Sequence, residues 1–343
     1  MKRRASALAV RGADVVAALV AVALGGCQLV SGLAEVEVAS TTGSGGHGPT
    51  YPCSPDPATC PESASPCLAL AMPPPSSPVT LRVAQLNLLH PDSLYGTNVK
   101  NAIFVNVTMN LPRCELNGLG TFSWLMEIDT KGGTLRTGAA KPAADPREGY
   151  AFVDEVIDSG GVPIHAAPVE LALTSGAAGG AFTAEGAEES YLPLYFDPDA
   201  TQAAILPIRS LRIKGTLSPD RACIGSYEPS GLLTSNDCIG DRQHPGYIDG
   251  GTIEGYVLLE EADSLIAGPF NQSLCVLLSG DTSKYGDGSI PTAHCARDAS
   301  GAIVFEGDWC SKTNGPREDG CADALQLYTG FAAAAVKLVG SSP

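Results

Sequence analysis

Short alternations of apolar and polar residues run through the chain from Val79 onward. In residues 79–89 and 103–111 the apolar side chains occupy every second position, as they do in strands with one buried face. Residues 121–129 and 134–137 are separated by Lys131-Gly132-Gly133, and glycines accept the positive φ that tight turns require. This stretch therefore predicts a hairpin.

The same pattern continues to the end of the chain. Further strands are expected in residues 150–157, 169–174, 191–196, 204–207 with 209–217, 251–260, 273–278 and 303–306. Residues 323–339 are ambiguous, because alanines at 332–335 favour a helix whereas the apolar residues at 325–331 alternate; we predict a final strand. No long amphipathic stretch predicts an ordinary helix. We therefore expect an all-β fold, an antiparallel β-sandwich or jelly-roll-like domain with disulfide-rich loops, over residues 79–343. A division near residue 218 is the alternative.

The first 27 residues have a different pattern. Lys2, Arg3 and Arg4 precede an uninterrupted apolar and small-residue run over 15–26, which is typical of an export signal. The run has about 12 residues, whereas a helix that spans a bilayer needs roughly 20, so a permanent transmembrane anchor is not expected. The Leu-Gly-Gly-Cys sequence that ends at Cys27 resembles the lipobox of bacterial lipoproteins.

This resemblance covers the signal alone. It implies that residues 1–26 are removed as a signal peptide and that the thiol of Cys27 is lipidated, with simple cleavage nearby as the alternative. Gln28 stands where an inner-membrane retention signal has Asp, so the resemblance implies the outer membrane of a Gram-negative cell, its inner or outer face left open. The residues after the signal resemble no family whose activity can be carried over.

Residues 27–78 are expected to form a lipidated, disordered tether. From residue 39 to 78 the chain is rich in Ser, Thr, Gly and Pro and has almost no large apolar side chains. About 40 flexible residues have an end-to-end distance of about 35 Å, which is enough to lift a domain clear of a lipid surface.

The charge balance limits the partners. The 343 residues include 21 Lys and Arg against 37 Asp and Glu, a net charge of −16. No basic patch is left for nucleic acid, and anionic lipid head groups repel such a chain. Contact with a membrane would therefore depend on the N-terminal lipid.

The chain has 11 cysteines, which fits an oxidising compartment. If Cys27 carries lipid, ten remain for disulfides: Cys53, Cys60, Cys67, Cys114, Cys223, Cys238, Cys275, Cys295, Cys310 and Cys321. The first four and the last six are each even in number, so we expect two bridges in the N-terminal part and three in the C-terminal third. Short loops favour Cys223 with Cys238. They also favour Cys310 with Cys321. Structural zinc is disfavoured because no C-x₂₋₄-C pair exists, and the odd trio of cysteines in the tether leaves a bridge between chains as an alternative.

Two segments look like parts of chymotrypsin-like serine proteases. Asp158-Ser159-Gly160-Gly161 is similar to the nucleophile segment, and residues 292–295, which include His294, are similar to the histidine segment. Their order along the chain is the reverse of the order in that family. We therefore interpret Ser159 as a turn residue and His294 as a neighbour of a disulfide.

The carboxylates at 188–189 and 260–263 invite comparison with the acid and base of a glycosidase. In so acidic a chain, solvated carboxylates are the simpler interpretation. A hydrolase would also place His165, His244 or His294 beside an acid and a nucleophile in one cleft.

Two acidic loops are weak calcium candidates, and no other cofactor is indicated. Asp281 and Asp287 lie in a glycine-containing loop that lacks the ligand pattern of an EF-hand, and Asp237, Asp241 and Asp249 lie in a second glycine-rich loop.

The chain has two tryptophans with different settings. Trp124 lies in an alternating strand and is expected in the core, whereas Trp309, beside Cys310 in a loop, is a candidate exposed stacking platform.

Together these features favour a non-catalytic cell-envelope lipoprotein that presents a β-sandwich surface or binding module. Its expected partners are the membrane, through the lipid, and a carbohydrate or another envelope protein. The alternative is a secreted hydrolase, glycosidase or protease-like, with an unrecognised active site.

Overall fold

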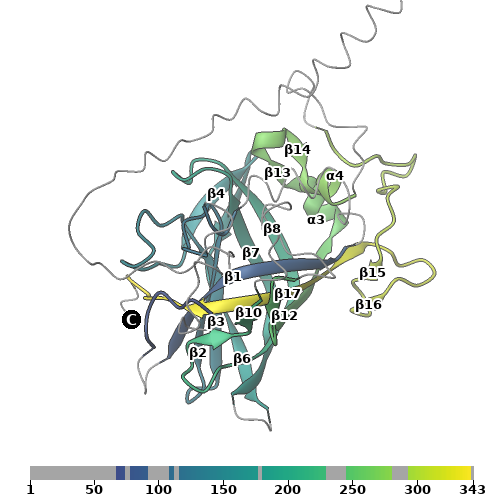
Figure 1. Cartoon of the computed structure of the whole chain (residues 1–343). Helices are drawn as coiled ribbons and strands as arrows, with labels where there is room; N and C mark the ends of the chain where they lie inside the picture. The colour runs from purple at the N-terminus through teal and green to yellow at the C-terminus, as the bar shows by residue number, and fades with distance from the viewer. Residues whose placement is uncertain are drawn as a thin grey trace, which may run out of the picture. The chain divides into compact units, whose positions relative to one another are not determined.

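The computed structural model describes residues 67–73, 78–91, 108–111, 116–176, 180–228, 245–279 and 293–340. All of them belong to a unit formed by residues 51–343. Antiparallel strands dominate this part of the chain, and its two α-helices, α3 (Leu259–Ser264) and α4 (Leu274–Ser279), have six residues each (Figure 1). The all-β antiparallel prediction is confirmed.

Eight long strands form a closed circuit within the 11-stranded main sheet. Each pairs antiparallel with the next, and the last pairs with the first. In spatial order they are β1 (Val79–His90), β2 (Ser123–Asp129), β3 (Thr134–Ala140), β6 (Val169–Ser175), β7 (Ala181–Tyr195), β8 (Ala203–Thr216), β12 (Gly251–Leu258) and β17 (Ala324–Ala335). Because the circuit is closed, the sheet has one inner face and one outer face.

Short elements occupy the connections between these strands. They are β4 (Glu155–Ser159), β5 (Val162–Ala166), β9 (Cys223–Ile224), β10 (Ser226–Tyr227), β11 (Tyr247–Ile248), β13 (Ile266–Ala267), η4 (Gly268–Phe270), β14 (Gln272–Ser273), β15 (Trp309–Cys310) and β16 (Gly315–Pro316). Helices α3 and α4 lie with β13 and β14 at one end of the long strands β7 and β8 (Figure 1).

The inner face holds the main hydrophobic core. On β8 the inward side chains of Ile208, Leu211 and Ile213 are no more than 1% exposed, and Ile253 of the neighbouring β12 is fully buried. Burial of each such side chain stabilises the fold by roughly 1.5–3 kcal/mol. Trp124 of β2 is also buried here, as the sequence predicts.

Several predicted strands are present with similar limits. The hairpin over residues 121–137 is β2 and β3, and Gly133 in its turn has φ of 70°. The ambiguous C-terminal segment is the strand β17. One sheet spans the alternative domain boundary near residue 218, because β12 pairs with β8 and β17 pairs with β1.

Two predicted strands are wrong, and a third is absent from the part of its range that the structure describes. Residues 274–279 form helix α4, whose residues 274–278 are all buried; such a continuous apolar run does not distinguish a strand from a buried helix. Residues 303–306 form only an isolated bridge at Ile303. Residues 108–111 are not a strand, and the rest of 103–111 lies outside the described residues.

The end of the predicted tether belongs to the domain. Cys67 and Leu68 are 8% and 5% exposed, and the amides of Leu70 and Ala71 both donate to the carbonyl of Ala335 on β17. Because these residues are anchored to the sheet, the assignment of all of 27–78 to a free tether is corrected from residue 67.

The outer face of the sheet differs between its two parts: buried side chains pack over β1 and β2, whereas the part formed by β7, β8 and β12, called the bare part, is more exposed to solvent. Over β1 and β2 it is covered: Arg82 of β1 is 2% exposed, donates to Ser123 Oγ at 2.9 Å and lies 5.6 Å from the ring centre of Tyr150. Tyr150 packs with Leu125 and Val336 in a second cluster of buried side chains, separate from the main core. Over β7, β8 and β12 the outer face carries exposed and half-buried charged side chains instead.

Candidate functional site

Several residues proposed from the sequence lie outside the part of the chain that the structure describes. These are the lipidation candidate Cys27, the cysteines Cys53, Cys60, Cys114 and Cys238, the calcium candidates Asp281, Asp287, Asp237 and Asp241, and His244. Asp249 is described; it is exposed, in a turn before β12, with φ of 53°.

The described residues contain three disulfides. Cys310–Cys321 is the pair that the sequence predicts, and Cys275–Cys295 joins helix α4 to the described segment that begins at residue 293. Cys67–Cys223 shows that both the two-group scheme and the pairing of Cys223 with Cys238 are wrong. The reason is spatial, because two distant segments bind the same end of β17. β9, which contains Cys223, pairs with this end, and the amides of residues 70 and 71 bind it too. Cys67 therefore lies next to Cys223, although 156 residues of sequence separate them.

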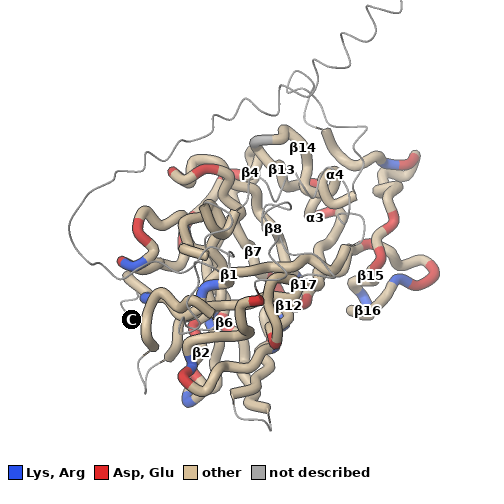
Figure 2. Tube along the Cα trace, in the orientation of Figure 1, with Lys and Arg blue, Asp and Glu red and all other residues tan. Residues whose placement is uncertain are grey.

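The bare part of the outer face, which we call the charged face, has complementary charges on neighbouring strands. Arg212 of β8 lies between Glu185 of β7, at 2.7 Å, and Glu254 of β12, at 4.0 Å. Lys214 of β8 also binds Glu254, at 2.8 Å. These ion pairs follow the strand register, in which residue 212 is opposite both 185 and 254. Acidic residues outnumber basic ones along the chain as a whole. Figure 2 marks both kinds of residue on the described part of the chain.

Irregularities in three adjacent strands coincide on this face. The pairing of β7 with β8 shifts between Glu185 and Ala187, where Gly186 has φ of 126°, a conformation that favours glycine. Ser210 of β8 has φ of 51°, and the pairing of β12 with β8 shifts between Glu254 and Tyr256. Bulges of this kind bend a strand locally and are common beside functional sites.

A groove of about 600 Å³ lies at these bulges. We call it the Trp309 groove; its lining includes Trp309, Arg212, Glu188, Glu254, Asn314 and Gln326. It combines one large aromatic ring with carboxylate, guanidinium and amide groups, which is the composition of a site for a polar organic ligand.

The hairpin that carries Trp309 is held rigidly. Trp309 pairs with Ala324 of β17, and its indole Nε1 donates to Asn314 Oδ1 at 3.2 Å. The next residue, Cys310, forms a disulfide with Cys321, and both the amide and hydroxyl of Ser311 donate to Asp323. The ring is half-buried, so a fixed aromatic surface borders the groove. The segment over residues 308–323, which includes this hairpin, carries charges of both signs (Figure 2).

A second charged cluster lies next to the groove along β7 and β8. Arg209 contacts Glu189 at 2.6 Å and binds Glu261 of α3 through two nitrogens at 3.1 Å. Tyr191 donates to both carboxylates. Burial and these two hydrogen bonds raise the pKa of the Tyr191 hydroxyl far above its usual value. The Glu261 hydrogen bond likewise raises the pKa of Arg209.

The carboxylates considered for a glycosidase therefore do meet, but as an ion-pair cluster. Glu189 and Glu261 share one guanidinium, whereas a general acid must keep its proton near neutral pH. Glu188 is exposed and belongs to the groove instead. The strand predicted over residues 251–260 ends at Leu258, and Glu260 and Glu261 lie on helix α3 instead.

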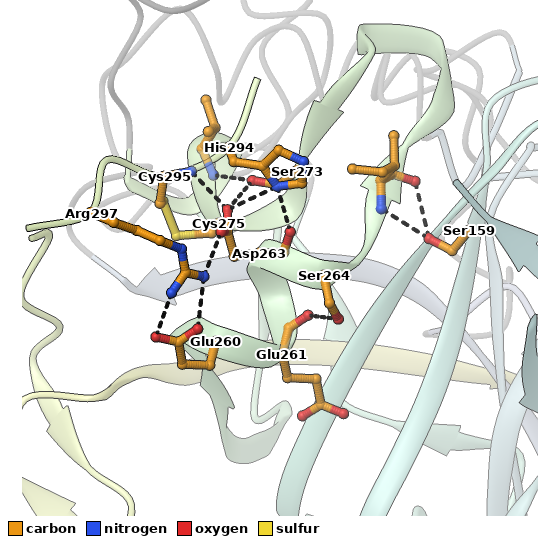
Figure 3. A network of polar contacts seen from close by, with 12 residues as sticks. Ser159, Glu260, Glu261, Asp263, Ser264, Ser273, Cys275, His294, Cys295 and Arg297 are labelled. Carbon is orange, nitrogen blue, oxygen red and sulfur yellow. Dashed lines mark hydrogen bonds and ion pairs between the residues drawn. A yellow bond between two sulfur atoms is a disulfide. The ribbon is translucent and has the colours of Figure 1, made fainter. Parts of the chain in front are cut away.

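The protease-like residues do not form a triad. Asp263, on α3, is at the centre of a polar network in which it accepts from Ser273 Oγ at 2.8 Å and lies 3.5 Å from His294 Nδ1 (Figure 3). In a Ser-His-Asp triad the histidine lies between the serine and the acid. Here the acid, Asp263, lies between Ser273 and His294. Ser159 binds both the carbonyl and the amide of Ile266 at 3.1 Å. Ser159 is the last residue of β4, so the prediction that it lies in a turn is wrong; Gly160 and Gly161 form the β4–β5 turn.

The Asp263 network joins α3 to the chain around the Cys275–Cys295 disulfide. The amide of Cys295 donates to Asp263 Oδ1 at 2.7 Å, and Arg297 binds Asp263 Oδ2 at 2.9 Å. The side chain of Asp263 is only 4% exposed. Burial raises the pKa of this carboxyl, but the hydrogen bonds from Cys295, Ser273 and Arg297 outweigh that effect and hold the pKa below its ordinary value.

The remaining candidates do not extend the site. His165 contacts Asp154 at 2.8 Å on an exposed hairpin, and both side chains are more than 60% exposed. Two groups of potential metal ligands occur in the described residues, Asp263 with Cys275 and Cys295, and Asp323 with Cys310 and Cys321. In each group both cysteines form a disulfide, so neither supplies the thiolate that a metal binds.

Comparison with models of protein families, with curated proteins and with solved structures finds no match to this chain. In the described part of the chain, none of the helices has the length and apolar character to cross a membrane.

The sequence singles out Trp309 as a stacking platform and Glu188 only as a candidate glycosidase carboxylate, and it does not indicate the other groove residues. The missed residues come from β7, β8, β12 and β17, whose neighbourhood depends on strand pairing that periodicity does not reveal. One usable signal existed: Gly186 and Gly255 interrupt strand patterns, and isolated glycines in strands indicate bulges or close approach. A Cβ at residue 255 would lie 2.7 Å from Ile208 Cγ2.

Proposed function

We propose that this protein is a non-catalytic cell-envelope lipoprotein whose all-β domain binds a carbohydrate in the Trp309 groove. The observation that carries the proposal is a rigidly held indole beside carboxylate, guanidinium and amide side chains in one groove. Sugar rings present an apolar C–H face, which packs on aromatic rings, and hydroxyl groups, which need hydrogen-bond donors and acceptors. The groove supplies both kinds of contact.

The arrangement of the polar residues supports a binding role over catalysis. In the described residues the histidines at 165 and 294 contact aspartates. The hydroxyls of Ser159 and Ser273 are bound by the Ile266 backbone and by Asp263. The acid that binds Ser273 is itself paired with Arg297, so this contact differs from the nucleophile–histidine pair of a hydrolase.

Lipidation of Cys27 and attachment to the outer membrane of a Gram-negative cell complete the proposal, and they rest on the signal sequence. If this part is right, intact-mass measurement of the mature protein gives a chain that starts at Cys27 and is heavier by a lipid. A Cys27→Ser variant is expected to lose that added mass and to leave the membrane fraction. A mature chain of unmodified mass would contradict the lipid anchor while leaving the groove untouched.

Carbohydrate binding is tested on the full chain, extracted from membranes in detergent. A panel of immobilised and soluble glycans is screened, and the tightest is measured by calorimetry against Trp309→Ala and Trp309→Phe variants. The alanine variant is expected to bind at least tenfold more weakly, because stacking on a large ring contributes on the order of 1.4 kcal/mol or more. The phenylalanine variant keeps a ring and is expected to retain most of the affinity.

Thermal unfolding and near-UV circular dichroism of the same variants show whether the fold is intact. If the wild-type protein binds no glycan, or if Trp309→Ala binds as well as wild type, the proposal fails. Release of new reducing ends from a bound glycan would favour the alternative of a secreted hydrolase. Capture of an envelope protein that depends on Trp309, with no glycan bound, would favour a protein partner instead.

A further inference from the structure

The charges in the Trp309 groove do not cancel. Three carboxylates line it, Glu185, Glu188 and Glu254, against the single guanidinium of Arg212. Arg212 is bound by Glu185 at 2.7 Å and lies 4.0 Å from Glu254, which in turn binds Lys214 at 2.8 Å. The charge of Arg212 is therefore already matched by its neighbours.

Among the residues that the structure describes, Glu188 is the one of these three carboxylates that has no ion-pair partner. It is exposed, and no hydrogen bond or ion pair joins its side chain to another residue in the described part of the chain. It lies two residues beyond the Gly186 bulge, in the same groove as the indole of Trp309. The groove lining therefore combines an unmatched negative charge with an indole ring.

A carboxylate and an indole in one groove are the two groups that attract an organic cation. The ammonium group is drawn to the carboxylate by charge and to the face of the indole by the ring quadrupole. A uronate or a phosphorylated sugar would meet repulsion from Glu188. The chain as a whole, with a net charge of −16, adds to that repulsion.

We propose that the Trp309 groove selects a glycan that carries a free amino group, with Glu188 as the residue that determines this preference. The inference rests on the proposed function and specifies its ligand class. The amino sugar stacks on Trp309 and places its ammonium group against the Glu188 carboxylate.

The test compares two ligands of equal length, a β-1,4-linked glucosamine oligosaccharide and its fully N-acetylated form, with the full chain in detergent. Calorimetry is carried out at mildly acidic pH, where the amino groups are protonated. The wild-type protein is expected to bind the amino form about three- to tenfold more tightly, the range for a partly exposed charge pair with a cation–π contact. This preference is expected to shrink in high salt, because exposed charges are screened.

Two matched variants separate the local charge from the net charge. Glu188→Gln is expected to remove the preference for the amino form and to leave binding of the N-acetylated form unchanged. Glu170→Gln removes an exposed carboxylate on β6, outside the groove lining, and is expected to keep the preference.

The outcomes distinguish this inference from the proposed function. If both oligosaccharides bind equally and the binding depends on Trp309, the amino-sugar preference is wrong and carbohydrate binding stands. If Glu170→Gln reduces the preference as much as Glu188→Gln, the effect comes from net charge and the role of Glu188 is overturned. If neither oligosaccharide binds, the inference fails, and the wider glycan panel decides the proposed function.

Discussion

Replacement of Asp263 by alanine is expected to lower the free energy of unfolding by about 3–5 kcal/mol. The side chain is 4% exposed and accepts hydrogen bonds from Ser273, from the Cys295 amide and from Arg297. Without the carboxylate, the buried hydroxyl and amide lose their acceptor, and α3 loses its link to the Cys275–Cys295 region. Urea unfolding of wild type and variant, followed by circular dichroism, measures the difference.

Glu260→Ala is the matched control for this variant. Glu260 lies three residues earlier on the same helix and binds the same Arg297 at 2.8 Å, but its side chain is 63% exposed. Exposed ion pairs contribute at most about 1 kcal/mol, so a small loss is expected. Equal losses for both variants would show that the arginine, rather than the burial of Asp263, accounts for the effect.

The contribution of Asp263 also has a defined pH dependence. Because its pKa is lower in the folded state than the value of about 3.9 in an unfolded chain, its stabilisation is fully present above that unfolded value. It is lost as the pH falls through the folded-state pKa. The gap in stability between wild type and Asp263→Ala is therefore expected to narrow on acidification, and a gap that widens would contradict the hydrogen-bond account.

Removal of the Cys67–Cys223 disulfide, by substitution of both residues with serine, is expected to have the second large effect. In the loop-closure model a crosslink over 156 residues contributes about 5 kcal/mol, and one over 11 residues about 3 kcal/mol. The double variant at Cys67 and Cys223 is therefore expected to lose more stability than the double variant at Cys310 and Cys321.

The two double variants also differ in what they release. Loss of Cys67–Cys223 frees residues 67–73 from β9, and these residues are expected to become sensitive to protease. Loss of Cys310–Cys321 loosens the hairpin that carries Trp309, so it is expected to weaken ligand binding. Urea midpoints, limited proteolysis and the glycan measurement follow these effects. If the two double variants have equal urea midpoints and residues 67–73 remain protected from protease, the predicted effect of the long-range crosslink is wrong.

Local patterns in the sequence were sufficient for the strands whose signal is contained within a few residues. The β2–β3 hairpin was predictable because an alternating run, a glycine turn and a second run follow one another directly. The C-terminal strand was predictable from the alternation of residues 325–331. Helix α4 was not, since Leu274 to Leu278 are buried on every side and have no period to read.

Local sequence patterns do not predict features that depend on contacts between residues far apart in the sequence. The Cys67–Cys223 bridge needs β9, β17 and residues 70–71 to meet, and loop length alone favoured Cys238 as the partner of Cys223. The groove is similar: Trp309 stood out by residue type, whereas Glu188 and Arg212 are common surface residues that gain meaning from the bulges beside them.

The pairing of β17 with β1 has a consequence for how the molecule is made. β1 lies near the start of the described chain and β17 near its end, so the folding chain holds two unpaired strand edges, on β1 and on β12, until its last strand is available. Free edges of this kind invite association between chains. A nascent chain that is truncated before residue 324 should therefore be an aggregation hazard, and cells that produce this protein have a reason to keep chaperones on it until its C-terminal strand arrives.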